Sequence, residues 1–229
     1  MWLMPVEMVI QDFLSKGEYL SFLEEALTPR RLEHSIQVME VMIELTPIYD
    51  LVPERAMAAG LLHDAAKDLS PSQQEQLIRD AGIHCYYECD HNYLLYLHGP
   101  VGAAFLEREL GIEDPLLLAA IESHTSYGNT PYFDHPLCWC LRFADVLEPT
   151  RNWRDEPTIR EHIHLLRKFV FEGRMSAGIV YQTSMLMRWF KEKGFPIHPN
   201  MIKANTRFAK KRKAEERSFT KFTTQGVYE

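Results

Sequence analysis

Apolar residues recur along the chain at the spacing of α-helices. From Leu32 to Ile43 and from Leu117 to His124 they step by three or four positions, which is the period of a helix with one buried face. The alternation of apolar and polar residues that is typical of strands is hard to find anywhere in the sequence. The pattern therefore predicts an all-α fold.

Prolines and glycines divide this pattern into segments of helical length. Several prolines stand where a first helical turn would begin, directly after Ser70, Asp114 or Glu156. Others, among them Pro47, are expected where a helix breaks. We expect a compact bundle of about eight to ten helices joined by short loops. The segment 83–96, rich in Tyr, Cys and His, is expected to be irregular.

Charge is unevenly distributed along the 229 residues, which carry a net charge of −7. From Met201 onward eight Lys/Arg stand against three Glu, so this end carries +5 and residues 1–200 carry −12. We expect one domain over residues 1–197 and a flexible basic tail over 198–229. An acidic body argues against nucleic acid as the main partner. The tail could still contact RNA, an acidic membrane surface or a protein.

No apolar run reaches the roughly 18–20 residues of a membrane-spanning helix. The segment Met1–Leu14 is apolar but carries Glu7 and Asp12 and lacks a basic leader, so it is not expected to be a signal peptide. The spacing of the four cysteines matches no zinc knuckle. These features favour a cytoplasmic protein with reduced thiols.

The candidate chemistry centres on the pair His63-Asp64, which closes the apolar run that begins at Gly60. A neutral imidazole nitrogen beside a carboxylate oxygen is a ligand mixture suited to Fe, Mn, Co or Zn. Further candidate ligands lie near predicted helix ends or on inward faces, namely His34, His98, His124 and Asp145.

Each of these residues, taken singly, is better explained by a role in the core. A lone histidine on an apolar face is usually hydrogen-bonded, and Asp145 could pair with Arg142 or Arg151. The complete order His, His-Asp, His, His, Asp is what favours a metal-dependent hydrolase.

Five motifs in this order resemble the HD-domain metal-dependent phosphohydrolase superfamily, and more narrowly its YqeK-type branch of symmetrical diadenosine tetraphosphate hydrolases. The motifs are Arg31-x-x-His34, Gly60-Leu-Leu-His63-Asp64-Ala-Ala-Lys67, Leu97-His98-Gly99-Pro-Val-Gly-Ala, Ala120-Ile-x-x-His124-Thr125 and Ala144-Asp145-x-x-Glu148-Pro149-x-Arg151. The resemblance extends from about residue 20 to about residue 195.

The resemblance implies a compact HD-domain helical bundle with two metal sites. His34, His63, Asp64 and Asp145 would hold the first metal, while His98 and His124 would complete a second site with Asp64 as the bridge. Two divalent transition metals are implied, with iron the best fit and manganese or cobalt as substitutes, because four imidazoles and only two carboxylates suit magnesium poorly.

The resemblance also implies cleavage of diadenosine tetraphosphate into two ADP. Beside Asp64, cationic Lys67, Arg31 and Arg151 would stabilise phosphate charge, and Thr125 would donate a hydrogen bond to a phosphate oxygen. As plain surface residues, Lys67 and Arg151 would instead be solvated or ion-paired.

Three matters stay open in the sequence. The substrate could be another nucleotide, such as a nucleoside 5′-monophosphate or guanosine tetraphosphate. The chain could also be a non-catalytic module that binds nucleotide and contacts RNA. The oligomeric state is undetermined, with a homodimer as one option.

Overall fold

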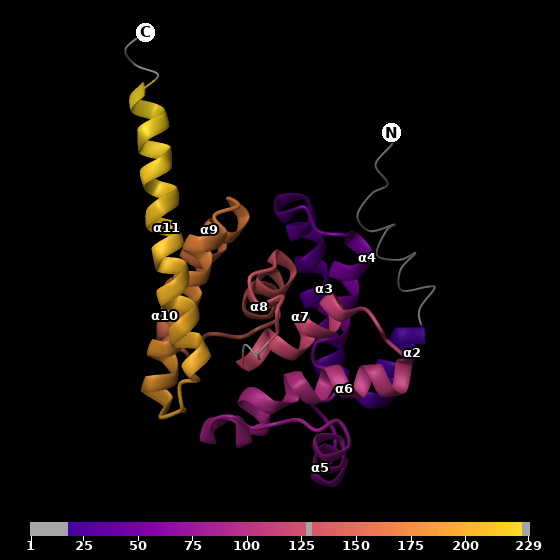
Figure 1. Cartoon of the computed structure of the whole chain (residues 1–229). Helices are drawn as coiled ribbons and strands as arrows, with labels where there is room; N and C mark the ends of the chain where they lie inside the picture. Colours follow the sequence, from indigo (N-terminus) through magenta and orange to yellow (C-terminus); the bar gives the residue numbers. More distant parts are fainter. Residues whose placement is uncertain (1–17, 127–129, 226–229) are drawn as a thin grey trace, which may run out of the picture. The chain divides into compact units, whose positions relative to one another are not determined.

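The structure is a computed structural model that describes residues 18–126 and 130–225. All regular elements within these ranges are helices, ten of them α-helices, which confirms the predicted all-α class and the expected number of helices. The chain divides into two compact units, Met1–Asn152 and Trp153–Glu229 (Figure 1). The segment Met1–Leu14, which was not expected to be a signal peptide, lies outside the described residues.

The first unit contains seven of the helices that the structure describes. They are α2 (Glu18–Ala26), α3 (Pro29–Tyr49), α4 (Pro53–Leu62), α5 (Pro71–Asp80), α6 (His98–Leu110), α7 (Pro115–Ser126) and α8 (Pro136–Leu147).

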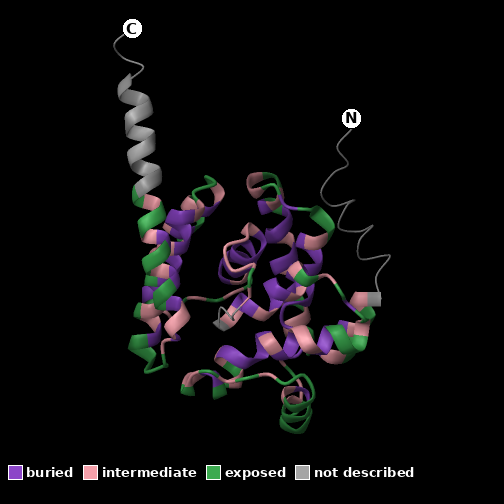
Figure 2. Cartoon of the chain, viewed as in Figure 1, coloured by how far each residue is buried: buried purple, intermediate pink, exposed green. Residues whose placement is uncertain are grey.

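The core of this unit lies where α3, α4, α7 and α8 pack together, with α6 against α7 (Figure 2). Its largest fully buried side chains include Met39 and Met42 from α3, Leu61 from α4, and Trp139 and Phe143 from α8. Burying one such side chain stabilises the fold by about 1.5–3 kcal/mol. The same four helices carry or directly precede most of the candidate ligands, so the core holds them in place.

Proline starts the helices where the sequence predicts it. Pro71, Pro115 and Pro157 are first residues of α5, α7 and the later helix α9 (Pro157–Phe171). Ser70 forms a capping box with Gln73, in which each side chain bonds the other residue's backbone N–H. The fixed φ and the missing N–H of proline are tolerated at the first residue of a helix.

The break expected at Pro47 is wrong. Pro47 lies inside α3, which continues to Tyr49 and ends at Asp50 in the left-handed conformation with a φ of 51°. Only Ile48 and Tyr49 of the helix follow this proline, so the one backbone hydrogen bond that it cannot donate lies in the last turn.

The segment 83–96 is only partly irregular. Residues 83–86 have no regular structure, but a 3₁₀ turn follows at Glu88–His91 and a π-helical turn at Tyr93–Leu97. The π turn runs directly into α6, whose first residue is His98. π turns of this kind often occur at functional sites.

The second unit consists of α9, α10 (Met175–Lys193) and α11 (Pro199–Gln225), and α10 packs against both of the others. Met201, Ala204 and Phe208 of α11 are buried, and Asn205 Nδ2 donates to the Val180 carbonyl at 3.1 Å. The start of the basic segment is thus a docked helix. The domain boundary at residues 197/198 and the flexibility of the remaining tail stay predictions.

Across the two described ranges, no helix combines the length and the apolar character needed to span a membrane.

Gly60 lets α3 and α4 approach closely. A Cβ at this position would lie 2.5 Å from Met39 Cα and 2.8 Å from Met39 N. These are backbone atoms of α3, so they cannot turn aside as a side-chain end would. The helix that carries His34 therefore rests directly on the helix that ends before His63.

We expect Gly60→Ala to lower the free energy of unfolding by about 1–3 kcal/mol, because the added methyl group forces the two backbones apart. Urea unfolding followed by circular dichroism measures this. Gly102→Ala is the matched control: its Cβ would meet nothing nearer than 3.6 Å, so it should be neutral or stabilise by up to about 1 kcal/mol. Equal stability of the two variants would contradict the close-contact account.

Candidate metal centre

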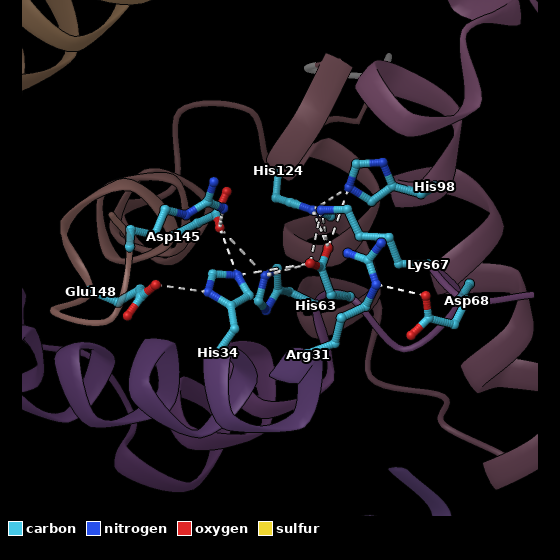
Figure 3. A network of polar contacts seen from close by, with 12 residues as sticks. Arg31, His34, His63, Lys67, Asp68, His98, His124, Asp145 and Glu148 are labelled. Carbon is cyan, nitrogen blue, oxygen red and sulfur yellow. Dashed lines mark hydrogen bonds and ion pairs between the residues drawn. The ribbon is translucent and has the colours of Figure 1, made fainter. Parts of the chain in front are cut away.

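All six predicted ligands meet at one place in the first unit. Figure 3 labels His34, His63, His98, His124 and Asp145 there. Most lie at helix ends: His63 directly follows α4, His98 opens α6, His124 lies in the last turn of α7 and Asp145 in the last turn of α8. His34 reaches the same place from the early part of α3. The structure thus brings together, from five helices or their ends, residues that are up to 111 positions apart in the sequence.

Asp64 lies at the centre of this cluster and divides it into two halves. Its Oδ2 is 3.6 Å from His63 Nε2 and 3.8 Å from His34 Nε2. Its Oδ1 is 3.3 Å from His98 Nε2 and 3.5 Å from His124 Nε2. Each carboxylate oxygen therefore faces its own pair of imidazoles.

Asp145 completes the first half of the cluster. Its Oδ1 lies 3.1 Å from His34 Nε2 and 3.6 Å from His63 Nε2. His34, His63 and Asp145 form one group with metal-ligand spacing, and His63, Asp64 and His124 form another.

Nδ1 of each imidazole donates a hydrogen bond to an oxygen outside the centre of the cluster. Nδ1 of His63 donates to Gly60 O at 2.8 Å, and Nδ1 of His124 to Ile121 O at 2.6 Å. Nδ1 of His98 donates to the Tyr93 carbonyl of the π turn at 3.1 Å. These bonds place the proton on Nδ1 and leave the Nε2 lone pair for the centre of the cluster.

Glu148 plays the same part for His34, whose Nδ1 donates to Glu148 Oε1 at 3.0 Å. Glu148 is itself buried and receives bonds from Thr150 N at 2.6 Å and Thr150 Oγ1 at 2.7 Å. Glu148 is part of a sequence motif, but no role was predicted for it. Its place three residues after Asp145 was the available signal.

The Nε2 atoms of the four imidazoles face the centre of the cluster in an arrangement that suits a bound cation. Nε2 of His63 is buried without a hydrogen-bond partner, while Nε2 of His34 faces Asp145 Oδ1 at 3.1 Å. Nε2 of His98 and Nε2 of His124 lie 3.2 Å apart, although each ring already donates its proton from Nδ1. Lone pairs facing one another in a buried site are unfavourable unless a cation lies among them.

The protonation states of the residues in the second half of the cluster also suit metal binding. Burial and then the charge of Lys67 lower the pKa of His98 to about 4, and burial lowers the pKa of His124. Burial raises the pKa of Asp64, but Lys67 and His63 outweigh it and hold the pKa well below its usual range. Neutral imidazoles around an ionised carboxylate are the form that binds metal.

The predicted cationic residues lie in three different settings. Lys67 Nζ is 2.8 Å from Asp64 Oδ2 and 3.1 Å from Oδ1. Arg151 donates to Asp145 Oδ1, so Arg151 and not Arg142 is the arginine that pairs with this aspartate. Both cations therefore touch a candidate metal ligand.

Arg31 and Thr125 have other partners. Arg31 Nε is 2.7 Å from Asp68 Oδ1, and Asp68 Oδ2 accepts from Thr28 N at 3.0 Å. Thr125 Oγ1 donates to the Tyr96 carbonyl at 2.6 Å. Contacts of Arg31 and Thr125 with a phosphate stay predictions. Asp68, which follows Lys67 directly, was not foreseen from the sequence.

The HD domain family matches residues 31–163, more than half of the chain. The chain therefore belongs to the HD domain family and is a metal-dependent phosphohydrolase of this type, whose His and Asp clusters could hold a divalent metal. This confirms the family, the fold and the enzyme class that the sequence motifs predict.

Two curated relatives and one solved structure add detail. A symmetrical bis(5′-nucleosyl)-tetraphosphatase from Halalkalibacterium halodurans is 28% identical over 193 residues, 82% of this chain and 94% of that protein. One of the same name from Staphylococcus aureus is 34% identical over 142 residues, 60% of this chain and 69% of that protein. A crystal structure from Clostridium acetobutylicum, of a "predicted HD superfamily hydrolase involved in NAD metabolism", has a TM-score of 0.73 and 28% identity. It covers 85% of this chain and 96% of that one.

Metal binding should release a proton from His34. Burial lowers the pKa of His34, but Asp145 and Glu148 outweigh it and raise the pKa to about 9 in the metal-free protein. Below pH 9 a metal must therefore displace this proton, so affinity should rise with pH up to about 9 and level off above it. Titration calorimetry at pH 7.5 in buffers of different ionisation enthalpy measures the protons released.

Glu148→Gln is the control for this prediction, because it keeps an acceptor for Nδ1 but removes one of the charges that raise the pKa. Fewer protons should then be released at pH 7.5. Equal proton release by both proteins would contradict the assignment to His34.

Proposed function

We propose that this protein hydrolyses diadenosine tetraphosphate symmetrically into two ADP with the help of two divalent metals. The observation that carries the proposal is the position of Asp64, whose two oxygens face two separate pairs of imidazoles. The first metal would be held by His34, His63, Asp64 and Asp145. The second would be held by His98, His124 and Asp64.

Iron is the proposed resident metal, and manganese or cobalt the proposed substitutes. Four imidazoles and two carboxylates form a donor set with more nitrogen than oxygen, which suits these ions and not magnesium. When bound in such a pair, the metals would supply a water whose pKa falls from 15.7 to around 7.

The reaction adds one water to one phosphoanhydride. The water oxygen bonds to a phosphorus next to the central bridging oxygen, the bond from that phosphorus to the bridge breaks, and each half leaves as ADP. Lys67 and Arg151 lie against the two carboxylate ligands, where their charges would stabilise the phosphate oxygens as negative charge develops. Asp68 would hold Arg31 ready for the same role.

The relatives support this substrate. Both curated relatives described above bear the name symmetrical bis(5′-nucleosyl)-tetraphosphatase, and the first is matched over nearly its whole length. Guanosine tetraphosphate and nucleoside 5′-monophosphates are the alternative substrates. A non-catalytic module that binds nucleotide or contacts RNA is less well supported, because all six ligands are brought together. A cytoplasmic location, a homodimer and an RNA contact through residues 198–229 stay predictions.

Anaerobic incubation of the iron-loaded protein with diadenosine tetraphosphate, followed by anion exchange, tests the proposal. We expect ADP as the only product. Asp64→Asn, which keeps the shape but loses the charge between the imidazole pairs, should give none. ATP with AMP would overturn the symmetrical cleavage, and no product from metal-loaded protein would overturn the substrate.

Lys67→Ala should keep its metal content but lower kcat on the order of 10²-fold, the scale expected for removal of one group that stabilises developing charge. Metal content by emission spectrometry and steady-state kinetics measure the two effects. Lys191→Ala, which removes an exposed lysine from α10, controls for the loss of a surface charge. Full activity of Lys67→Ala would contradict the assigned role.

A further inference from the structure

Arg142 is a buried cation that the proposed reaction does not use. Only 3% of its surface is exposed, although placing a charge in a core costs several kcal/mol unless it is well compensated. Its guanidinium carbon lies 4.2 Å from the centroid of the Trp139 ring and 5.4 Å from that of Phe133. Aromatic faces attract this planar cation and also fix its plane.

The guanidinium is aimed at one backbone atom. Arg142 Nε donates to Ser123 O at 2.9 Å, and Nη2 donates to the same oxygen. Ser123 lies near the carboxyl end of the described part of α7 (Pro115–Ser126). A cation at this end also complements the helix dipole.

Ser123 directly precedes His124, the ligand that α7 contributes to the second half of the metal centre. The bond from His124 Nδ1 to Ile121 O fixes the ring relative to its own helix. It does not fix the end of that helix relative to α8. The packing of α7 against α8 and the bonds from Arg142 in α8 to Ser123 O link the two helices there, and only these bonds act on the residue next to His124.

The opposite end of α7 has an anchor of its own. Asp114 Oδ1 accepts from Leu116 N at 3.0 Å and Leu117 N at 3.1 Å, and Asp114 Oδ2 is 2.6 Å from Arg55 Nε. Two arginines thus anchor the two ends of one helix, but only Arg142 acts next to a candidate ligand.

We propose that Arg142 is a positioning residue for the second metal site, where it holds His124 at the distance from His98 and Asp64 that binding requires. The inference rests on the proposed two-metal centre. It assigns Arg142 no contact with substrate or metal. Partners that orient a metal ligand commonly change metal affinity 10- to 100-fold when they are removed.

The test compares metal binding, not activity, across matched variants. Arg142→Met keeps most of the apolar stem but leaves Ser123 O without its charged donor. Arg142→Lys keeps the charge with a different shape. Arg55→Gln loosens the other end of α7, and His124→Ala removes the ligand itself. Each protein is titrated anaerobically with Fe²⁺, while ¹⁵N NMR of the metal-free protein reports the tautomer of His124.

The wild type should bind two ions. Arg142→Met should bind the first ion normally and the second at least tenfold more weakly, with a His124 signal that shifts while the ring keeps its Nδ1-protonated tautomer, because the bond to Ile121 O stays. The second-ion affinity of Arg142→Lys should lie between those of the wild type and Arg142→Met. His124→Ala should bind one ion. Arg55→Gln should unfold at lower temperature and still bind two ions, because its anchor lies far along the helix from His124.

Second-ion affinity within twofold of wild type in Arg142→Met, with an unchanged His124 signal, would overturn the role of Arg142 and leave the two-metal proposal standing. If Arg142→Met fails to fold, Arg142→Lys decides: its second-ion affinity should fall at least threefold while the first is unchanged. Unchanged binding of both ions by Arg142→Lys would then overturn the role. A wild type that binds one ion would overturn the second site and the role of Arg142 with it.

Discussion

The buried carboxylate of Asp64 is the constraint on which this structure depends. Only 1% of Asp64 is exposed, and an ionised carboxylate so far from water needs positive charge or hydrogen bonds on both oxygens. Lys67 supplies a cation in the metal-free protein, and four imidazoles surround the rest of the group. An arrangement of this kind stabilises the fold fully only when cations share the site, which couples metal binding to folding.

Helix ends make this arrangement possible. The residue after α4, the start of α6 and the last turns of α7 and α8 all converge on Asp64. Backbone carbonyls near such ends, those of Gly60, Ile121 and Tyr93, are used to hold imidazole protons. The missing Cβ of Gly60 lets α3 approach and bring His34 to the same point. The same contacts therefore pack the core and orient the candidate ligands.

The fold class, the proline starts of the helices and the set of six candidate ligands that come together were predictable from the sequence, since periodicity, capping and the order of His and Asp are local or sequential signals. The role of Glu148, the pairing of Arg31 with Asp68 and the bonds from Arg142 to Ser123 were not. Each depends on how two segments distant in the chain meet, as with His34 and Glu148, 114 positions apart. The π turn before His98 was missed because its five residues carry no periodicity long enough to recognise. The predicted helix break at Pro47 was wrong because a proline in the sequence does not show how close it lies to the end of its helix.

The most direct test of the account is a crystal structure of the iron-loaded protein with anomalous diffraction measured at the iron edge. The account predicts two anomalous peaks, one between Asp64 Oδ2 and the imidazoles of His34 and His63, the other between Asp64 Oδ1 and those of His98 and His124. A single peak in the first half, with His98 and His124 bonded only to protein, would contradict it.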